Sequence, residues 1–230
     1  MTPSRAVIFD MDGVLIDSEP AHLDATNEIL SREGAYLSAE QNRPYLGTND
    51  VSYWKALSER FSLAGTLDHY IAERQVVLVR RLKETLPLAE GLIPFLDELK
   101  AQGVALAVAS GSDRELVEFV VEEGGLSGYF PVIASGDEVT RPKPDPEIFL
   151  LAAQRLECDP QSCVVLEDSP NGARAALEAG MRCFRVLTAT TQSLEFPKTA
   201  GEIATFCGLK ADQVLIGHDA DDLSSKRQEP

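Results

Sequence analysis

Short runs of apolar or mostly apolar residues recur along the chain. The clear runs cover residues 6–9, 104–109, 132–134, 163–166 and 183–186, and a weaker one covers 214–216. Continuous apolar runs of this length are typical of strands that are buried on both faces, as in a parallel sheet. The pattern therefore predicts a largely parallel sheet covered by helices.

Helical periodicity fills the segments between these runs from residue 91 onward. In EGLIPFLDELKAQG, Leu92, Phe95, Leu96 and Leu99 fall on one helix face, and Gly103 marks the helix end. The alternation of strand and helix is that of βαβ units. We therefore predict an α/β fold, a doubly wound and mostly parallel sheet with a Rossmann-like core.

One long segment breaks this alternation directly after the first strand. Residues 17–87 contain no convincing strand, and residues 22–34, 51–61 and 67–84 have helical spacing. The simplest account is an all-helical cap, residues 17–87, inserted into a core made of residues 1–16 and 88–230. Such an insertion can lie over the carboxyl ends of the strands, where open α/β sheets bind ligands.

Two carboxylates stand at the end of the first strand. Asp10 and Asp12 are two residues apart, so both point to the same side of an extended chain, and Gly13 allows a sharp turn after them. Clustered carboxylates repel one another and cost free energy to desolvate. The pair therefore indicates a site for metal binding, acid–base chemistry or nucleophilic attack.

The ends of other predicted strands add complementary groups. Ser110 supplies a hydroxyl group, and Gly111 lets a backbone N–H approach an anion closely. Lys143 lies in a loop that three prolines stiffen. Glu167 and Asp168 close a later strand, just before a helix. These groups predict an anion-binding pocket with acidic walls.

The charges in this pocket call for a cation. Asp10, Glu167 and Asp168 bring about three negative charges, of which Lys143 offsets one and a divalent ion two. Carboxylate and carbonyl oxygens suit Mg²⁺ better than zinc. We therefore predict Mg²⁺ as the cofactor.

The overall composition limits the partners. The 230 residues carry a net charge of −16, which argues against binding to nucleic acid or to an anionic membrane surface. We see no transmembrane run, no signal peptide and no CxxC pair among four scattered cysteines, and expect a cytoplasmic protein. A small phosphorylated substrate is the expected partner. The sequence does not determine the oligomeric state, and a monomer is compatible with it.

Four segments together resemble a known family. They are DMDGVLIDSE, the serine after the second strand, the lysine in RPKPDPEIF, and LEDSPNG. In order and spacing they resemble the four motifs of the haloacid dehalogenase superfamily. The inserted segment is similar to the cap of the subfamily with a small helical cap, which includes β-phosphoglucomutase-like proteins and sugar-phosphate phosphatases.

The resemblance implies a role for each matching residue. Asp10 is the nucleophile that forms an aspartyl-phosphate, and Asp12 is the general acid and then the base. Ser110 and Lys143 hold the phosphoryl oxygens. The resemblance also implies the Mg²⁺ ligands, which are Asp10, the backbone carbonyl of Asp12 and Asp168, with Glu167 close by.

In the cap, Glu19, His22 and Gly47 are candidates for contact with the substrate. For His22 we favour a packing or surface role. The composition of the cap does not name a substrate. A sugar phosphate is the first expectation, by resemblance alone.

Departures from the family patterns separate the possible activities. Dehalogenases of the superfamily lack the second aspartate, and its phosphonate hydrolases carry a cap lysine that residues 17–30 lack. β-Phosphoglucomutases carry an arginine where Asp50 stands, and a cap lysine near residues 72–75, which read AERQ here. We therefore favour a phosphatase and keep a phosphosugar mutase as the alternative. A phospho-acceptor domain is more remote, because such domains place the acidic pair and the phosphorylated aspartate on different strands and have no helical cap. A binding domain without turnover is the third possibility.

Overall fold

The computed structural model describes residues 5–46, 48, 50–192 and 194–215. Within them, six parallel strands form one sheet in the order β3-β2-β1-β4-β5-β6. The strands are β1 Ala6–Phe9, β2 Ala105–Ala109, β3 Val132–Ala134, β4 Cys163–Glu167, β5 Arg182–Val186 and β6 Gly201–Ile203. This sheet confirms the doubly wound α/β fold that the apolar runs predict.

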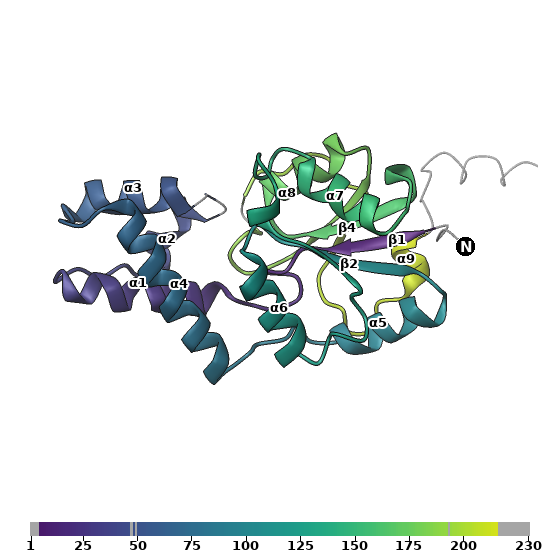
Figure 1. Cartoon of the computed structure of the whole chain (residues 1–230), viewed down its shortest axis with the longest axis horizontal. Helices are drawn as coiled ribbons and strands as arrows, with labels where there is room; N and C mark the ends of the chain where they lie inside the picture. The colour runs from purple at the N-terminus through teal and green to yellow at the C-terminus, as the bar shows by residue number, and fades with distance from the viewer. Residues whose placement is uncertain (1–4, 47, 49, 193, 216–230) are drawn as a thin grey trace, which may run out of the picture.

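Helices cover both faces of the sheet (Figure 1). They are α5 Leu92–Ala101, α6 Arg114–Glu123, α7 Glu147–Arg155, α8 Pro170–Glu178 and α9 Ala211–Leu215. In β1, Val7 and Phe9 pack with α5, α6 and α9, whereas Ala6 and Ile8 pack with α7 and α8. Because side chains alternate along a strand, a continuous apolar run supplies both cores.

The prediction of a strand at 214–216 is wrong. Val214 and Leu215 belong to the short helix α9, and Ile216 lies outside the described residues. Three apolar residues are too few to distinguish a buried helix end from a strand. The sixth strand is instead β6, in which Ile203 is buried and Gly201 lies against the ring of Phe184. This edge strand contains one large apolar residue and therefore lacks the apolar run that marks the other strands.

The segment after β1 is helical, as predicted. It contains α1 Glu19–Arg32, α2 Ala39–Asn42, the 3₁₀ turn Arg43–Tyr45, α3 Asp50–Phe61 and α4 Leu67–Glu84. These helices have their own apolar core, in which Trp54 is fully buried and stacks on Tyr70 with ring centroids 5.1 Å apart. Within the described residues, no helix is both long and apolar enough to cross a membrane.

The two connections between the cap helices and the sheet run side by side. The N–H of Ala89 donates to the carbonyl of Leu15 at 2.9 Å, and the N–H of Asp17 donates to the carbonyl of Pro87 at 3.0 Å. Figure 1 shows the cap helices lying together beyond one edge of the core. We propose the division into a core of 1–16 and 88–230 and a cap of 17–87 on this basis.

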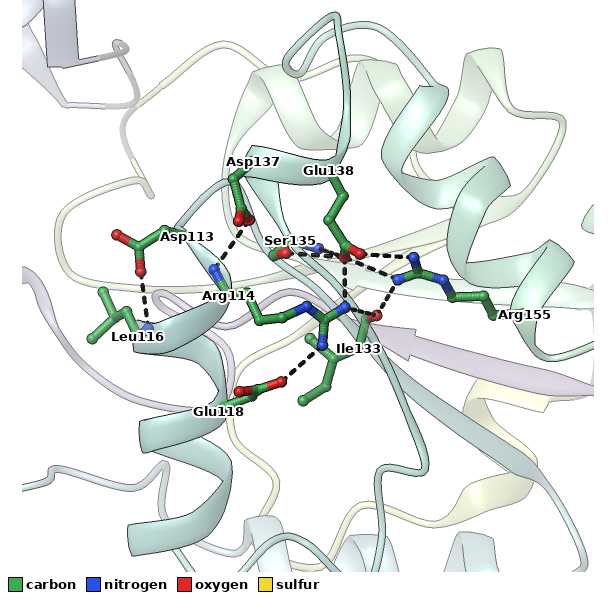
Figure 2. Close-up of polar contacts among 9 residues, drawn as sticks. All are labelled: Asp113, Arg114, Leu116, Glu118, Ile133, Ser135, Asp137, Glu138 and Arg155. Carbon is green, nitrogen blue, oxygen red and sulfur yellow. Dashed lines mark hydrogen bonds and ion pairs between the residues drawn. The ribbon is translucent and has the colours of Figure 1, made fainter.

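A network of ion pairs ties the end of β3 to two core helices (Figure 2). Arg155 donates to both carboxylate oxygens of Glu138, at 2.8 and 2.9 Å, and Arg114 donates to one of them at 2.7 Å. The backbone N–H and hydroxyl of Ser135 donate to the same carboxylate. The hydrogen bonds from Arg155, Ser135 and Arg114 hold the pKa of Glu138 well below its usual value of 4.5.

We expect Glu138→Gln to lower the free energy of unfolding by about 1 kcal/mol at pH 7, because charge-assisted hydrogen bonds are lost from a partly exposed site. A depressed pKa in the folded state means that the ionised carboxylate stabilises the fold above pH 4.5 and loses that effect as the pH falls. The difference between variant and wild type should therefore shrink below pH 4.5, as measured by denaturant titration.

The matched control for this experiment is Glu118→Gln. Glu118 also binds Arg114, at 2.9 Å, but its side chain is 47% exposed. Its loss should change stability by less than about 0.5 kcal/mol. A Glu138→Gln effect that is the same at every pH would contradict the electrostatic origin.

Candidate active site

The carboxylates predicted at the strand ends lie between β1 and β4, where the order of the strands along the sheet changes direction. Asp10 and Asp12 follow β1, while Glu167 ends β4 and Asp168 follows it. β1 and β4 are neighbours, and the chain leads from β1 to β2 on one side and from β4 to β5 on the other. Ligands of open α/β sheets bind in the crevice at such a switch point.

Lys143 lies between the two strand ends. Its ammonium group donates to Oδ1 of Asp10 at 2.5 Å, to Oε1 of Glu167 at 3.0 Å and to the carbonyl of Ala109 at 3.2 Å. Burial opposes this charge, but Asp10 and Glu167 raise the pKa of Lys143 above its ordinary value. Lys143 therefore stays an ammonium group in the pocket.

Hydrogen bonds to the first turn of α7 hold the loop that carries Lys143. The N–H groups of Thr140 and Arg141 donate to the carboxylate of Glu147, at 3.0 and 3.1 Å, in the first turn of α7. Arg141 also pairs with Asp145 at 2.7 Å. These contacts connect the lysine loop to a core helix.

Asp10 is buried, with 6% of its surface exposed. Burial raises the pKa of Asp10 to about 7, against the lowering effect of Lys143, and the nearby charges of Glu167 and Asp12 add to the rise. Burial and the charges of Glu167, Asp10 and Asp12 likewise raise the pKa of Asp168 well above its usual value. One lysine does not offset the negative charge of this pocket.

The donors of the pocket fit a magnesium ion. The carboxylate of Asp168 lies against Gly13, because a Cβ at Gly13 would be 2.2 Å from Oδ2 of Asp168. It therefore adjoins the backbone that follows Asp12. In the described part of the chain no three Asp, Glu, His or Cys side chains group as a complete metal site. Two carboxylates, a backbone carbonyl and water molecules are the set that Mg²⁺ accepts.

Asp12 has partners that the sequence did not reveal. The hydroxyl of Ser18 donates to its Oδ1 at 2.5 Å, that of Ser112 to its Oδ2 at 3.3 Å, and Nε2 of His22 lies 3.5 Å from Oδ1. Burial raises the pKa of Asp12, but His22, Ser18 and Ser112 outweigh it and hold the pKa below its usual value. One signal was present, since Ser112 stands two residues after Ser110.

The loop after β2 lies beside these groups. Ser110 is 1% exposed, and its hydroxyl accepts from the N–H of Ser112 at 3.1 Å. Gly111 is exposed, and a Cβ built on it would meet nothing within 4 Å. The loop thus presents an open backbone segment between two serines.

The candidate cap residues lie in different surroundings. His22, for which the sequence favoured packing, contacts Asp12, whereas Glu19 accepts from Asn42 at 3.2 Å within the cap. Burial raises the pKa of Glu19 above its usual value. Gly47 lies outside the described residues. A cap–core contact that the sequence did not predict joins Gln75 to Asp113 at 2.9 Å.

A cleft of about 990 Å³ opens beside the acidic pocket. It is lined by cap residues of α1 and α2, including Glu19 and Asn42, and by core residues that include Gly13 and Thr188. The hydroxyl of Thr188 lies 3.5 Å from Oδ2 of Asp168, so the cleft borders the carboxylates. The cleft between cap and core therefore adjoins the acidic pocket at Gly13 and Thr188.

Known phosphatases and a solved structure are similar to this chain over most of its length. A phosphorylated carbohydrates phosphatase from Thermotoga maritima is 32% identical over 213 residues, which are 92% of this chain and 96% of that protein. The fructose-1-phosphate phosphatase YqaB from Escherichia coli is 34% identical over 179 residues, which are 76% of this chain and 92% of that protein. A solved structure of a CbbY variant from Rhodobacter sphaeroides in complex with xylulose 1,5-bisphosphate is 30% identical. It has a TM-score of 0.78 and covers 89% of this chain and 96% of its own.

A family model agrees with these relatives and confirms the resemblance drawn from the motifs. The model of the haloacid dehalogenase-like hydrolases matches residues 4–180, which span all four motif segments and more than half of the chain. The protein therefore belongs to the haloacid dehalogenase-like hydrolase family.

Proposed function

We propose that the protein is a Mg²⁺-dependent phosphatase that hydrolyses a small phosphomonoester through an aspartyl-phosphate on Asp10. The observation that carries this proposal is the contact of the Asp10 carboxylate with Lys143 at the switch point, beside Asp12 and the Ser110 loop. A buried carboxylate and a fixed ammonium group suit attack on a phosphoryl group, whose oxygens need positive charge.

The first half-reaction transfers the phosphoryl group to the protein. A carboxylate oxygen of Asp10 forms a bond to phosphorus while the bond from phosphorus to the alcohol oxygen breaks. Lys143 and Ser110 bind the phosphoryl oxygens, and the proton of Asp12 goes to the departing alcohol oxygen. In the free protein the partners of Asp12 favour its carboxylate. A bound phosphate dianion raises the pKa of a neighbouring acid, and this is how Asp12 takes up the proton that it donates.

The second half-reaction releases phosphate. Asp12, now a carboxylate, removes a proton from water as the water oxygen attacks phosphorus. The bond from phosphorus to Asp10 breaks, which restores its carboxylate. Bound Mg²⁺ supplies positive charge beside the transferring group. Asp10, Asp168 and the carbonyl of Asp12 are the residues that would hold it, with Glu167 close by, and Lys143 contacts both Asp10 and Glu167.

The cap favours hydrolysis over a mutase reaction. A mutase that uses a bisphosphorylated sugar needs cap cations for the second phosphate. Arg74 pairs with Asp50 at 2.7 Å and lies over the ring of Tyr53, 5.2 Å from its centroid, so its charge is already matched. This pairing makes Arg74 a poor ligand for a second phosphate, which supports hydrolysis of a monophosphate over a mutase reaction.

A sugar phosphate is the substrate class that we propose. The names of the two relatives, which refer to phosphorylated carbohydrates and to fructose 1-phosphate, support this class. The cleft between cap and core supports it as well, since Glu19 and Asp24 line it with carboxylate oxygens, which accept hydrogen bonds from hydroxyl groups.

Phosphate release from a panel of sugar phosphates, nucleotides and phosphoglycolate tests this function. We expect turnover with Mg²⁺ and a loss of at least about 100-fold in excess EDTA, because the cation contributes several kcal/mol to the transition state. Re-addition of Mg²⁺ should restore the rate. Full activity in EDTA would contradict the metal requirement, and formation of an isomeric sugar phosphate without phosphate release would favour the mutase.

A further inference from the structure

The loop of Ser110, Gly111 and Ser112 rests on the turn that follows the neighbouring strand β3. The N–H of Ser110 donates to the carbonyl of Ala134 at 3.0 Å, and the N–H of Gly136 donates to the carbonyl of Ser112 at 2.7 Å. A Cβ on Gly136 would lie 2.1 Å from the carbonyl oxygen of Gly111 and 2.7 Å from its carbonyl carbon. The backbone at Gly136 therefore contacts that of Gly111 with no room for a side chain.

Ion pairs hold the turn Gly136–Glu138 in place from both sides (Figure 2). Glu138 is bound by Arg114 of α6 and by Arg155 of α7. Oδ1 of Asp137 accepts the N–H of Arg114 at 3.1 Å, in the first turn of α6. Because α6 begins directly after Ser112 and Asp113, the same turn supports the loop and the start of the helix that follows it.

We infer that Gly136 and Glu138 are positioning residues for the phosphoryl-binding loop. Neither residue lines the cleft between cap and core. Gly136 acts through its backbone contact with Gly111 and Ser112, and Glu138 acts by holding the turn in which Gly136 lies. This inference rests on the proposed function, because it concerns the loop that we propose to bind phosphate.

The decisive variant is Gly136→Ala. The added methyl group must displace the backbone of Gly111, which is not a flexible side-chain end. A displacement of about 1 Å at a binding group costs about 100-fold in rate. We therefore expect kcat/KM to fall about 100-fold, and the Kd of inorganic phosphate, measured by calorimetry with Mg²⁺ present, to rise at least about tenfold.

Two controls separate positioning from general destabilisation. Gly128→Ala makes the same chemical change in a solvent-exposed turn of the core domain, where a Cβ would meet nothing within 4 Å. This variant should leave kcat/KM and the phosphate Kd unchanged. Val214→Ala removes buried methyl groups in α9 and should lower the melting temperature without changing the phosphate Kd. While a variant stays almost entirely folded at the assay temperature, its apparent Kd equals the Kd of the folded protein, so a loss of stability alone does not change the measured value.

Each outcome decides a question. If the wild type does not bind phosphate, the proposed function fails and this inference fails with it. If the wild type binds and Gly136→Ala binds equally well, the positioning role alone is overturned. If Gly136→Ala does not fold, the phosphate Kd of Glu138→Gln tests the positioning role instead. A phosphate Kd raised about threefold supports the role, and an unchanged Kd with a lowered melting temperature overturns it.

Discussion

Asp10→Asn is expected to abolish phosphate release, with kcat lowered by about 10⁴-fold or more. The amide has nearly the shape of the carboxylate but is not a nucleophile toward phosphorus. Lys143 keeps its contacts with Glu167 and with the carbonyl of Ala109 in the variant, so the pocket should stay assembled. Removing one buried charge beside Glu167 and Asp168 also relieves repulsion, so we expect the melting temperature to be maintained or raised.

Two measurements check this prediction. Steady-state phosphate release gives kcat, and calorimetry with inorganic phosphate shows whether the site still binds. Asp68→Asn, an exposed acid in the first turn of cap helix α4, is the matched control and should have wild-type kinetics. Turnover close to that of the wild type in Asp10→Asn would overturn the assignment of the nucleophile.

Asp12→Asn should slow the breakdown of the phosphorylated protein by about 10²- to 10⁴-fold, since the attacking water loses its base. Loss of the general acid matters less with a leaving group that needs no proton, such as 4-nitrophenolate. With 4-nitrophenyl phosphate we therefore expect a burst of product close to one equivalent, followed by slow turnover. Asparagine retains an oxygen that can accept from Ser18 or Ser112, which limits structural change.

The phosphorylated protein itself is the readout for Asp12. Intact-mass analysis after mixing should detect a phosphoryl adduct on Asp12→Asn, and none on the double variant Asp10→Asn, Asp12→Asn. Breakdown of the adduct at the wild-type rate would contradict the role of Asp12. An adduct that also persists on the wild-type protein would favour the phospho-acceptor alternative over an enzyme with turnover.

Local patterns determined most of the fold. The strands β1 and β3 coincide with their apolar runs, and β2, β4 and β5 differ from theirs by one residue at an end. A strand buried on both faces is mostly apolar, so its limits can be read from consecutive residues, although Arg185 interrupts the run of β5. The exceptions are at the sheet edge, where β6 packs one large residue and α9 shows too short an apolar run to reveal its periodicity.

The residues of the candidate site could also be predicted from the sequence, because they lie at or after the ends of predicted strands. In a parallel sheet the carboxyl ends of the strands lie at one edge, so residue order places Asp10, Ser110 and Glu167 near one another, and Lys143 lies in the long loop that follows β3. Their contacts agree with that placement in the case of Lys143, which bonds both Asp10 and Glu167. The roles of these residues in catalysis stay predictions until the variants are measured.

The sequence by itself determined the kind of fold and the kind of chemistry, because both depend on residue types at regular spacings. Only the tertiary structure decided which groups adjust that chemistry. Ser112 reaches Asp12 across 100 positions of sequence, and Arg74 is neutralised by Asp50 across 24. Gly136 contacts the backbone of Gly111, and a glycine in the sequence does not by itself indicate which distant segment it contacts. Such contacts depend on the packing of distant segments in three dimensions, and no local pattern of polar and apolar residues encodes them.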